Sequence, residues 1–186
     1  MTSPRTVETR DRLRLFCGLQ FPDDALDRLV SWQQAELAGA GVRLVAREQL
    51  HITLAFLGSR PADEVAAIAE ALRAAAAEAE PPLLQAVRYR ETRSVGMVVL
   101  ADTDDRAARF ADDLQRRLAE LGLYEREARP WLPHVTVARF RSRPRLHPAP
   151  SDLGVVSPSD AALYNSVLRS TGAQYVILES VALGGT

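Results

Sequence analysis

The chain has 186 residues, which is long enough for one well-buried core. Hydrophobic residues make up 47% and charged residues 25%, a composition typical of globular proteins that excludes a disordered or fibrous chain. The formal net charge of −1 argues against a protein that binds long nucleic acid by general electrostatics. A small anionic substrate needs only a few local charges.

Cysteine and arginine usage restricts the possible chemistry. The single cysteine, Cys17, excludes an internal disulfide and a cysteine-based metal cluster. It lies in the apolar run RLFCGLQF, which indicates a small buried residue rather than a nucleophile. All 23 basic residues are arginine, and biased codon usage explains this, so the arginine content alone does not indicate phosphate recognition.

The N-terminal segment and the hydropathy of the chain bear on its location. Residues 1–12 are polar and charged, which is unlike a signal peptide. No stretch approaches the ~20 continuous apolar residues of a membrane span. We therefore expect a disordered tail over residues 1–10 and a single domain over residues 11–186. We also expect a cytoplasmic monomer without membrane contact.

The first half of the chain alternates strands with helices. A buried strand is predicted over residues 13–21, followed by a helix over residues 22–38, with proline and acidic residues favoured at its start. Strands over residues 42–46 and 49–58 come next. A second helix over residues 61–80 ends at two prolines, which cannot continue it.

The middle of the chain continues this pattern. Two consecutive strands are predicted over residues 83–91 and 94–101. A third helix over residues 104–121 begins at two aspartates and stops at Gly122. The side chains expected to face inward from this helix are Phe110, Leu114, Leu118 and Leu121.

The last part of the chain is predicted to be strand-rich. A strand over residues 134–140 precedes a segment, residues 141–160, whose proline, serine and arginine content indicates a loop. Strands over residues 161–170 and 174–183 form a hairpin that turns at residues 170–172.

The order of elements repeats along the chain. In each half, a strand and a long helix lead to a strand that carries a His-x-Thr sequence. The spacing from Leu13 to His51 is 38 residues, and from Val95 to His134 it is 39. Two halves of similar order suggest duplication or pseudo-twofold symmetry. The sequence therefore predicts an α+β protein with two strand-rich lobes.

The two His-x-Thr sequences are HITLAF, residues 51–56, and HVTVAR, residues 134–139. Because side chains alternate along a strand, each histidine shares a face with its threonine, His51 with Thr53 and His134 with Thr136. The residues expected on the opposite, core-facing side are Ile52, Leu54, Phe56, Val135 and Val137. If a twofold relates the lobes, the two His-Thr faces converge on one cleft.

Two imidazoles across a cleft suit proton transfer at a phosphorus centre. With an ordinary pKa of ~6.5, one histidine can be neutral while the other is protonated near neutral pH. The neutral one takes a proton from an attacking water, and the charged one gives a proton to the departing oxygen. The threonine hydroxyls can donate to the non-bridging oxygens, so no metal is required.

A single His-x-Thr sequence is usually an incidental polar pair on a half-exposed strand. Two of only three histidines, however, lie in matching sequences at matching places in the two halves. The third, His147 in RLHPAP, has no such context and is expected to be a surface residue.

The paired motifs resemble those of the two-histidine (2H) phosphoesterases. The most similar members are the bacterial and archaeal RNA 2′,3′-cyclic phosphodiesterases, also called 2′-5′ RNA ligases. The likeness covers most of the chain. It extends to the flanking sequences RLFCGLQFP, VRLVAREQLHITLAFLG, PWLPHVTVARF and NSVLRSTGAQYVILESVAL. The segment VRLVAREQLH lacks the tryptophan often found before the first motif.

The resemblance implies a fold and a reaction. The fold is two pseudo-symmetric lobes of antiparallel sheet, flanked by helices, around a central cleft. His51 and His134 would be the acid/base pair, with Thr53 and Thr136 contacting the phosphate. Water would open a 2′,3′-cyclic phosphate at an RNA end or in a nucleotide, leaving a 2′-phosphomonoester, without a cofactor. The residues do not decide which histidine is the base; our working assignment is His134.

The arginines after the second motif have several interpretations. Arg139 matches an arginine that often closes this motif in the family, which implies phosphate binding. Strict alternation places its side chain away from His134, so either a bulge re-aims it or it is structural. Arg141, Arg143 and Arg145 form either a basic rim for an RNA end or, as we favour, a solvated loop.

Three alternatives stay open at the level of sequence. The substrate can be a small molecule such as ADP-ribose 1″,2″-cyclic phosphate, with the same chemistry. The protein can be a non-catalytic module that binds RNA ends or nucleotides. A zinc hydrolase using both histidines ranks last, because the sequence has no closely spaced ligand pair.

Overall fold

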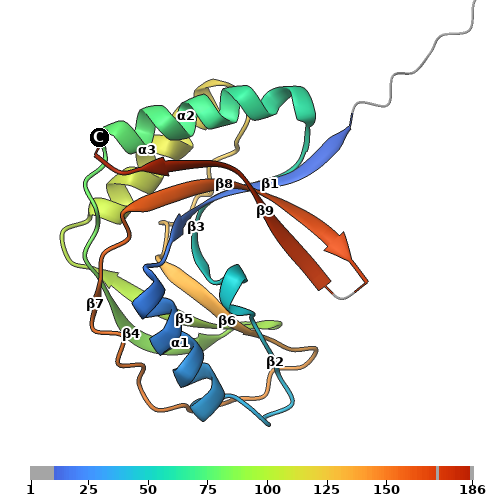
Figure 1. Ribbon diagram of the computed structural model, residues 1–186, viewed down its shortest axis with the longest axis vertical. Coiled ribbons are helices and arrows are strands. Elements are labelled where there is room, and N and C mark those ends of the chain that lie inside the picture. Colours follow the sequence, from blue (N-terminus) through green and yellow to red (C-terminus); the bar gives the residue numbers. More distant parts are fainter. Residues whose placement is uncertain (1–10, 171, 185–186) are drawn as a thin grey trace, which may run out of the picture.

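The computed structural model describes residues 11–170 and 172–184, and its strands form one antiparallel sheet (Figure 1). The tail expected over residues 1–10 lies outside these residues. The strands are β1 (Arg12–Gln20), β2 (Arg43–Leu44), β3 (His51–Pro61), β4 (Leu84–Glu91), β5 (Val95–Asp102), β6 (His134–Arg139), β7 (Val155–Val156), β8 (Asp160–Arg169) and β9 (Gly172–Ala182).

Three α-helices and two short 3₁₀ helices accompany the sheet. They are α1 (Asp23–Glu36), α2 (Val65–Glu78), α3 (Arg106–Glu120), η1 (Arg47–Gln49) and η2 (Ala62–Glu64). The element order therefore follows the predicted alternation, and the fold is α+β as expected.

The sheet consists of two lobes that meet at β3 and β6. Its order is β7-β4-β5-β6-β3-β1-β8-β9, with β2 added to β6. The two motif strands run antiparallel and pair through Ile52 and Val135. Each also pairs antiparallel with the strand that precedes its helix, β3 with β1 and β6 with β5. The predicted repeat is thus present, and its pseudo-twofold runs through the seam between the motif strands.

Two helices, α1 and α3, each pack against the lobe that the other half of the repeat forms. α1 follows β1 in the chain but lies beside β4, β5 and β6, whereas α3 follows β5 and lies with α2 over the lobe of β1, β8 and β9 (Figure 1). Trp32 of α1 packs near Tyr89 of β4, with ring centroids 6.2 Å apart. Each motif strand is therefore covered by a helix that the other half of the repeat supplies.

The sequence prediction was wrong for the segment 141–160 and for Leu121. The segment 141–160 contains the short strand β7, because Val156 is buried and pairs with Leu84 at the sheet edge. Leu121 does not face inward but is 55% exposed, since it caps the C-terminus of α3; Leu123 is buried instead. The predicted final hairpin is confirmed as β8 and β9, although Thr171 of its turn lies outside the described residues.

The burial of Cys17 and the character of the helices also bear on the sequence predictions. Cys17 is fully buried, as predicted, and burial raises the pKa of its thiol to about 12. None of the helices in residues 11–170 and 172–184 has the length and apolar character needed to cross a bilayer.

Candidate active site

The two histidines stand at the seam between the lobes, at the first positions of β3 and β6. Because these strands run antiparallel through the Ile52–Val135 pair, Thr136 lies on the His51 side and Thr53 on the His134 side. Both histidines and both threonines are partly exposed, while the residues between them are buried. The expected convergence of the two His-Thr faces is therefore present.

A β-bulge interrupts each motif strand three residues after its histidine. Between β1 and β3, Cys17 pairs with Ala55 and Gly18 with Thr53, so Leu54 of β3 has no register partner on β1. Opposite β6, Gly96 pairs with Ala138 and Met97 with Thr136, so Val137 is left over in the same way. The extra residue shifts the alternation, and the side chains that follow change face. The buried residues at the two bulges are Leu54, Ala55, Val137 and Ala138.

The bulges explain on which face of the sheet the side chains of Phe56 and Arg139 lie. Phe56 was expected in the core with Ile52 and Leu54, but it is 51% exposed and lines the same recess as His134. Arg139, which strict alternation placed away from His134, is exposed on the cleft side, as the bulge alternative required. The third cleft residue of the motifs is therefore aromatic in one half and cationic in the other.

A buried glutamine binds the carbonyl of each bulge. Gln115 of α3 donates from Nε2 to the carbonyl of Leu54 at 2.7 Å. Gln33 of α1 donates to the carbonyl of Val137 at 2.6 Å and to that of Val45 at 3.1 Å. The carbonyl of Val137 also accepts from the backbone amide of Val45 at 2.9 Å. The glutamine amides add hydrogen bonds at both bulges and thereby stabilise them. Sequence analysis missed both, although each lies one turn after a buried apolar residue and thus on an apolar helix face.

Backbone carbonyls orient both imidazoles. Nδ1 of His51 lies 2.7 Å from the carbonyl oxygen of Gln49, and Nδ1 of His134 lies 2.8 Å from that of Leu132. A carbonyl only accepts, so each Nδ1 carries the hydrogen and each Nε2 is left for proton transfer. Nε2 of His51 also lies 3.1 Å from the hydroxyl oxygen of Thr53.

The surroundings of His51 favour its neutral form. Burial is the largest cause that lowers the pKa of His51, to about 4, and the charges of His134 and Arg139 lower it further; the bond to Gln49 acts in the opposite direction. Phe16 stacks on the imidazole with ring centroids 4.7 Å apart, and Tyr175 meets it edge-on at 5.4 Å. In the unliganded site, His51 is therefore neutral at physiological pH.

Gly18 supports His51 from the neighbouring strand. A Cβ atom at position 18 would lie 3.1 Å from Cδ2 of His51 and 3.0 Å from the carbonyl oxygen of Ile52. A larger residue at position 18 would therefore displace the His51 ring or the backbone of β3 by a few tenths of an ångström. Sequence analysis assigned Gly18 no role, although a glycine within an apolar strand is a known signal for close backbone approach.

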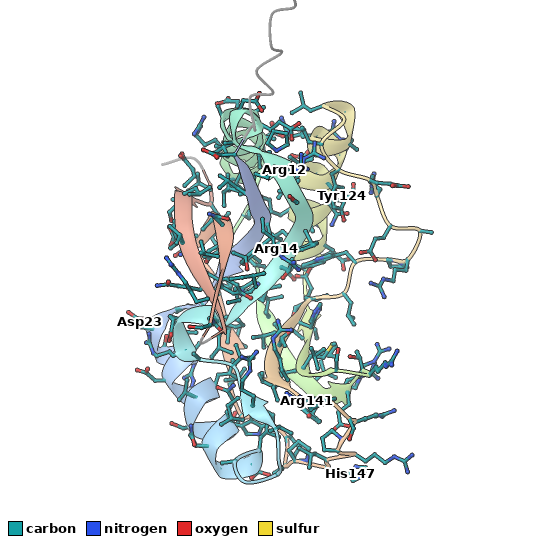
Figure 2. The ribbon with its side chains drawn as sticks, turned by 90° about the vertical axis from the view of Figure 1, so that its right-hand side faces the viewer. Arg12, Arg14, Asp23, Tyr124, Arg141 and His147 are labelled. Atoms are coloured by element: carbon teal, nitrogen blue, oxygen red, sulfur yellow. The ribbon has the colours of Figure 1, made fainter. Side chains whose placement is uncertain are left out.

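Two recesses flank the histidine pair. The first, which we call the aromatic recess, has a volume of about 500 Å³ and is lined by Phe56, Tyr124 and Trp131 together with His134. Trp131 donates from Nε1 to the carbonyl of Thr53 at 3.0 Å, which fixes its ring beside the motif strands. Figure 2 shows Tyr124 on the loop that follows α3.

The second, which we call the basic recess, has a volume of about 480 Å³. Its lining includes Arg43, Arg139 and Arg169, together with Gln49 and Tyr175. The candidate residues from both motifs thus lie between an aromatic recess and a basic recess.

The loop after β6 contributes less to the site than the basic-rim interpretation required. Arg143 forms an ion pair with the buried Glu91 at 3.2 Å, and the backbone amide of Arg145 donates to the same carboxylate at 2.9 Å. Arg141 lines a recess beside Arg139. His147 is exposed at the lower end of the molecule, as expected for a surface residue (Figure 2).

In residues 11–170 and 172–184, no three histidine, cysteine, aspartate or glutamate side chains are grouped so as to bind a metal ion. The polar groups around the histidine pair are instead threonine hydroxyls and arginine guanidinium groups.

Comparison with solved structures supports this arrangement of elements. A crystal structure of a Thermus thermophilus protein superposes with a TM-score of 0.77 at 29% identity, covering 93% of this chain and 99% of the other. Escherichia coli LigT, complexed with 3′-AMP, gives a TM-score of 0.78 at 22% identity, covering 93% of this chain and 99% of that one.

Comparison with characterised sequences agrees with the structures. The RNA 2′,3′-cyclic phosphodiesterase of Thermus thermophilus is 32% identical, over 93% of this chain and 91% of its own. That of Escherichia coli is 26% identical, over 91% of this chain and 96% of its own. The family model for the 2′-5′ RNA ligase superfamily matches residues 21–167, which include both His-x-Thr motifs. The chain therefore belongs to the 2′-5′ RNA ligase superfamily.

Proposed function

We propose that the protein hydrolyses 2′,3′-cyclic phosphate ends of RNA or nucleotides to 2′-phosphomonoesters, by a two-histidine acid/base mechanism that needs no metal. The observation that carries the proposal is the pair of antiparallel motif strands, which hold two imidazoles at one seam with each Nε2 free of a backbone partner. The relatives named RNA 2′,3′-cyclic phosphodiesterase support it.

The reaction follows from the positions of the polar groups. The neutral histidine takes a proton from water, whose oxygen bonds to phosphorus as the bond from phosphorus to the 3′ oxygen breaks. The protonated histidine gives its proton to that 3′ oxygen. Thr53, Thr136 and Arg139 stabilise the negative charge that develops on the non-bridging oxygens. The 2′-phosphomonoester then dissociates. At that point the two histidines have exchanged protonation states.

The aromatic recess supports a nucleotide as the substrate. Phe56, Tyr124 and Trp131 border the side of the cleft next to His134. Nucleobases stack on such side chains, at about 1–3 kcal/mol per base. Escherichia coli LigT has been solved in complex with 3′-AMP, which agrees with a nucleotide site in this fold.

The assignment of acid and base requires an experiment. The pKa of His51 is lowered to about 4, so this histidine is neutral at physiological pH. A bound phosphate anion favours the charged form of an adjacent imidazole, so acid and base are assigned with the substrate in place. A 3′-thio cyclic phosphate, whose sulfur leaves without protonation, restores turnover only to the variant that lacks the acid. If turnover of the 3′-thio substrate is restored in His51→Ala, His51 is the acid and His134 the base. If it is restored in His134→Ala, the two roles are reversed.

One assay separates the proposed function from its alternatives. Purified protein is incubated with nucleoside 2′,3′-cyclic phosphates, short RNAs with cyclic phosphate ends and ADP-ribose 1″,2″-cyclic phosphate, with and without EDTA. We expect 2′-phosphomonoesters at equal rates in both conditions. Loss of activity in EDTA contradicts the metal-free mechanism, and faster turnover of the ADP-ribose compound supports the small-molecule alternative. Binding without turnover of any substrate identifies a binding module.

We further propose that the active form is a cytoplasmic monomer. The seam carries both histidines from one chain, so the site is complete without a second copy. Sedimentation during turnover tests this, with activity expected to sediment as one chain.

A further inference from the structure

The basic recess contains arginines that have no acidic partner. Arg43, Arg139 and Arg169 are exposed, and within the described residues none of them forms an ion pair. Other arginines of the protein are neutralised; for example, Arg47 pairs with Asp23 and Asp27, each at 2.9 Å. Among the described residues, Glu48 is the only carboxylate in the lining of the recess, so the recess carries a net positive charge.

Two of these arginines face each other across a ladder. Arg43 of β2 is the register partner of Arg139 of β6, so their side chains project from directly opposite positions. Like charges at opposite positions destabilise a sheet. Bound anions relieve this repulsion: the reacting phosphate beside Arg139 and a second anion beside Arg43 would each form charge-assisted hydrogen bonds.

The shape of the recess is fixed by contacts with the β8–β9 hairpin. The side-chain amide of Gln49 donates to the carbonyl of Ala173, which ties η1 to β9. Arg43 reaches the start of β9, where a Cβ atom at Gly172 would lie 3.1 Å from its Nη1. Gly172 has a φ of 125°, a conformation that favours glycine.

The basic recess adjoins His51. Tyr175 lines it and also meets the His51 ring edge-on at 5.4 Å. The carbonyl of Gln49, another lining residue, accepts the Nδ1 hydrogen of His51 at 2.7 Å. A group bound in this recess would therefore lie next to His51.

We propose that the basic recess binds a second phosphoryl group, on the 5′ carbon of the sugar that carries the cyclic phosphate. The inference rests on the proposed function and narrows its substrate class. A ribose places its cyclic phosphate at one edge, and its base and 5′ oxygen toward two other corners. The aromatic recess and the basic recess lie on opposite sides of the histidine pair, as such a ligand requires. Both RNA ends and ADP-ribose 1″,2″-cyclic phosphate carry a phosphoryl group there; a simple nucleoside cyclic phosphate does not.

The test compares kcat/KM for adenosine 2′,3′-cyclic phosphate with and without a 5′-phosphate. We expect the wild type to prefer the 5′-phosphorylated substrate by roughly 10- to 100-fold, the effect of one or two charge-assisted hydrogen bonds. Arg43→Gln and Arg169→Gln should each reduce this preference about fivefold or more. Arg109→Gln is the matched control, because it removes an exposed arginine of α3 outside the recess and should keep the wild-type preference.

Equal kcat/KM for the two substrates in the wild type overturns the proposal, as does an equal loss on both substrates in Arg43→Gln. If neither substrate is turned over, the proposed function fails, and binding then tests the recess separately. Calorimetry should show tighter binding of adenosine 2′,5′-bisphosphate than of adenosine 2′-phosphate, with the difference reduced in Arg43→Gln. Equal binding of the two ligands contradicts the assignment of the recess.

Discussion

At His51, neighbouring residues set both the position and the protonation of one imidazole. Phe16 stacks on its face, Gly18 leaves room beneath it, and the carbonyl of Gln49 holds its Nδ1. The aromatic packing removes the ring from water, which destabilises the imidazolium. The motif alone indicates an ordinary histidine, but the Phe16 ring and Gly18 of β1 and the backbone carbonyl of Gln49 in η1 set its position and protonation.

Substitution of Gly18 by alanine should reduce kcat without unfolding the protein. The new Cβ atom would press on Cδ2 of His51 and move the ring by a few tenths of an ångström. We expect a loss in kcat of roughly tenfold, since a 1 Å displacement of a catalytic group can cost about 10²-fold. Cys17→Ala on the core side of the same strand is the control, and it should lower thermal stability while retaining kcat. Wild-type kcat in Gly18→Ala would remove the proposed constraint.

The lowered pKa of His51 also predicts how stability depends on pH. The unfolded chain gains this proton near the ordinary pKa of ~6.5, but the folded protein gains it only near pH 4. The stabilisation is therefore complete above pH ~6.5 and is lost as the pH falls toward 4. The wild type should lose more Tm between pH 7 and pH 5 than His51→Gln, which cannot titrate there. An equal loss would show that His51 has an ordinary pKa; the direct measurement is its NMR titration.

At the scale of elements, the two bulges decide which side chains reach the cleft. Each bulge carbonyl is bound by a glutamine from a helix that belongs to the other half of the repeat, Gln115 for Leu54 and Gln33 for Val137. The motif strands could be predicted because alternating polar and apolar residues have a period of two. The bulges could not, because Leu54–Ala55 and Val137–Ala138 read as continuous apolar strand, and their stabilising amides come from distant helices.

Removal of the Gln33 amide should destabilise the fold. Gln33→Leu leaves the buried carbonyls of Val45 and Val137 without this donor, and we expect a loss of about 1–3 kcal/mol in the free energy of unfolding. The neighbouring Gln34 is exposed on the same helix, so Gln34→Leu should change stability by no more than about 0.5 kcal/mol. Equal denaturant midpoints for the two variants would show that the bulge does not depend on Gln33.

At the scale of the molecule, a pseudo-symmetric frame holds an asymmetric site. The repeat of strand, helix and motif strand could be predicted from spacing and composition, and it brings His51 and His134 to one seam. The difference between the two recesses depends on tertiary contacts. Arg139 shares the basic recess with Arg43 of β2 and Arg169 of the final hairpin. Phe56 shares the aromatic recess with aromatic residues of the loop after α3. Such partners are far apart in the sequence, so local patterns carry no signal for them.

The central claim is that His51 and His134 transfer protons as a pair. The most direct measurement is kcat/KM for a 2′,3′-cyclic phosphate substrate in His51→Ala, His134→Ala and the double variant, with folding confirmed by circular dichroism. Each single substitution should reduce the value by about 10²–10⁴-fold, and the double variant should lose little more than either, because the residues act as a unit. A single variant that retains a near-normal rate would contradict the two-histidine mechanism.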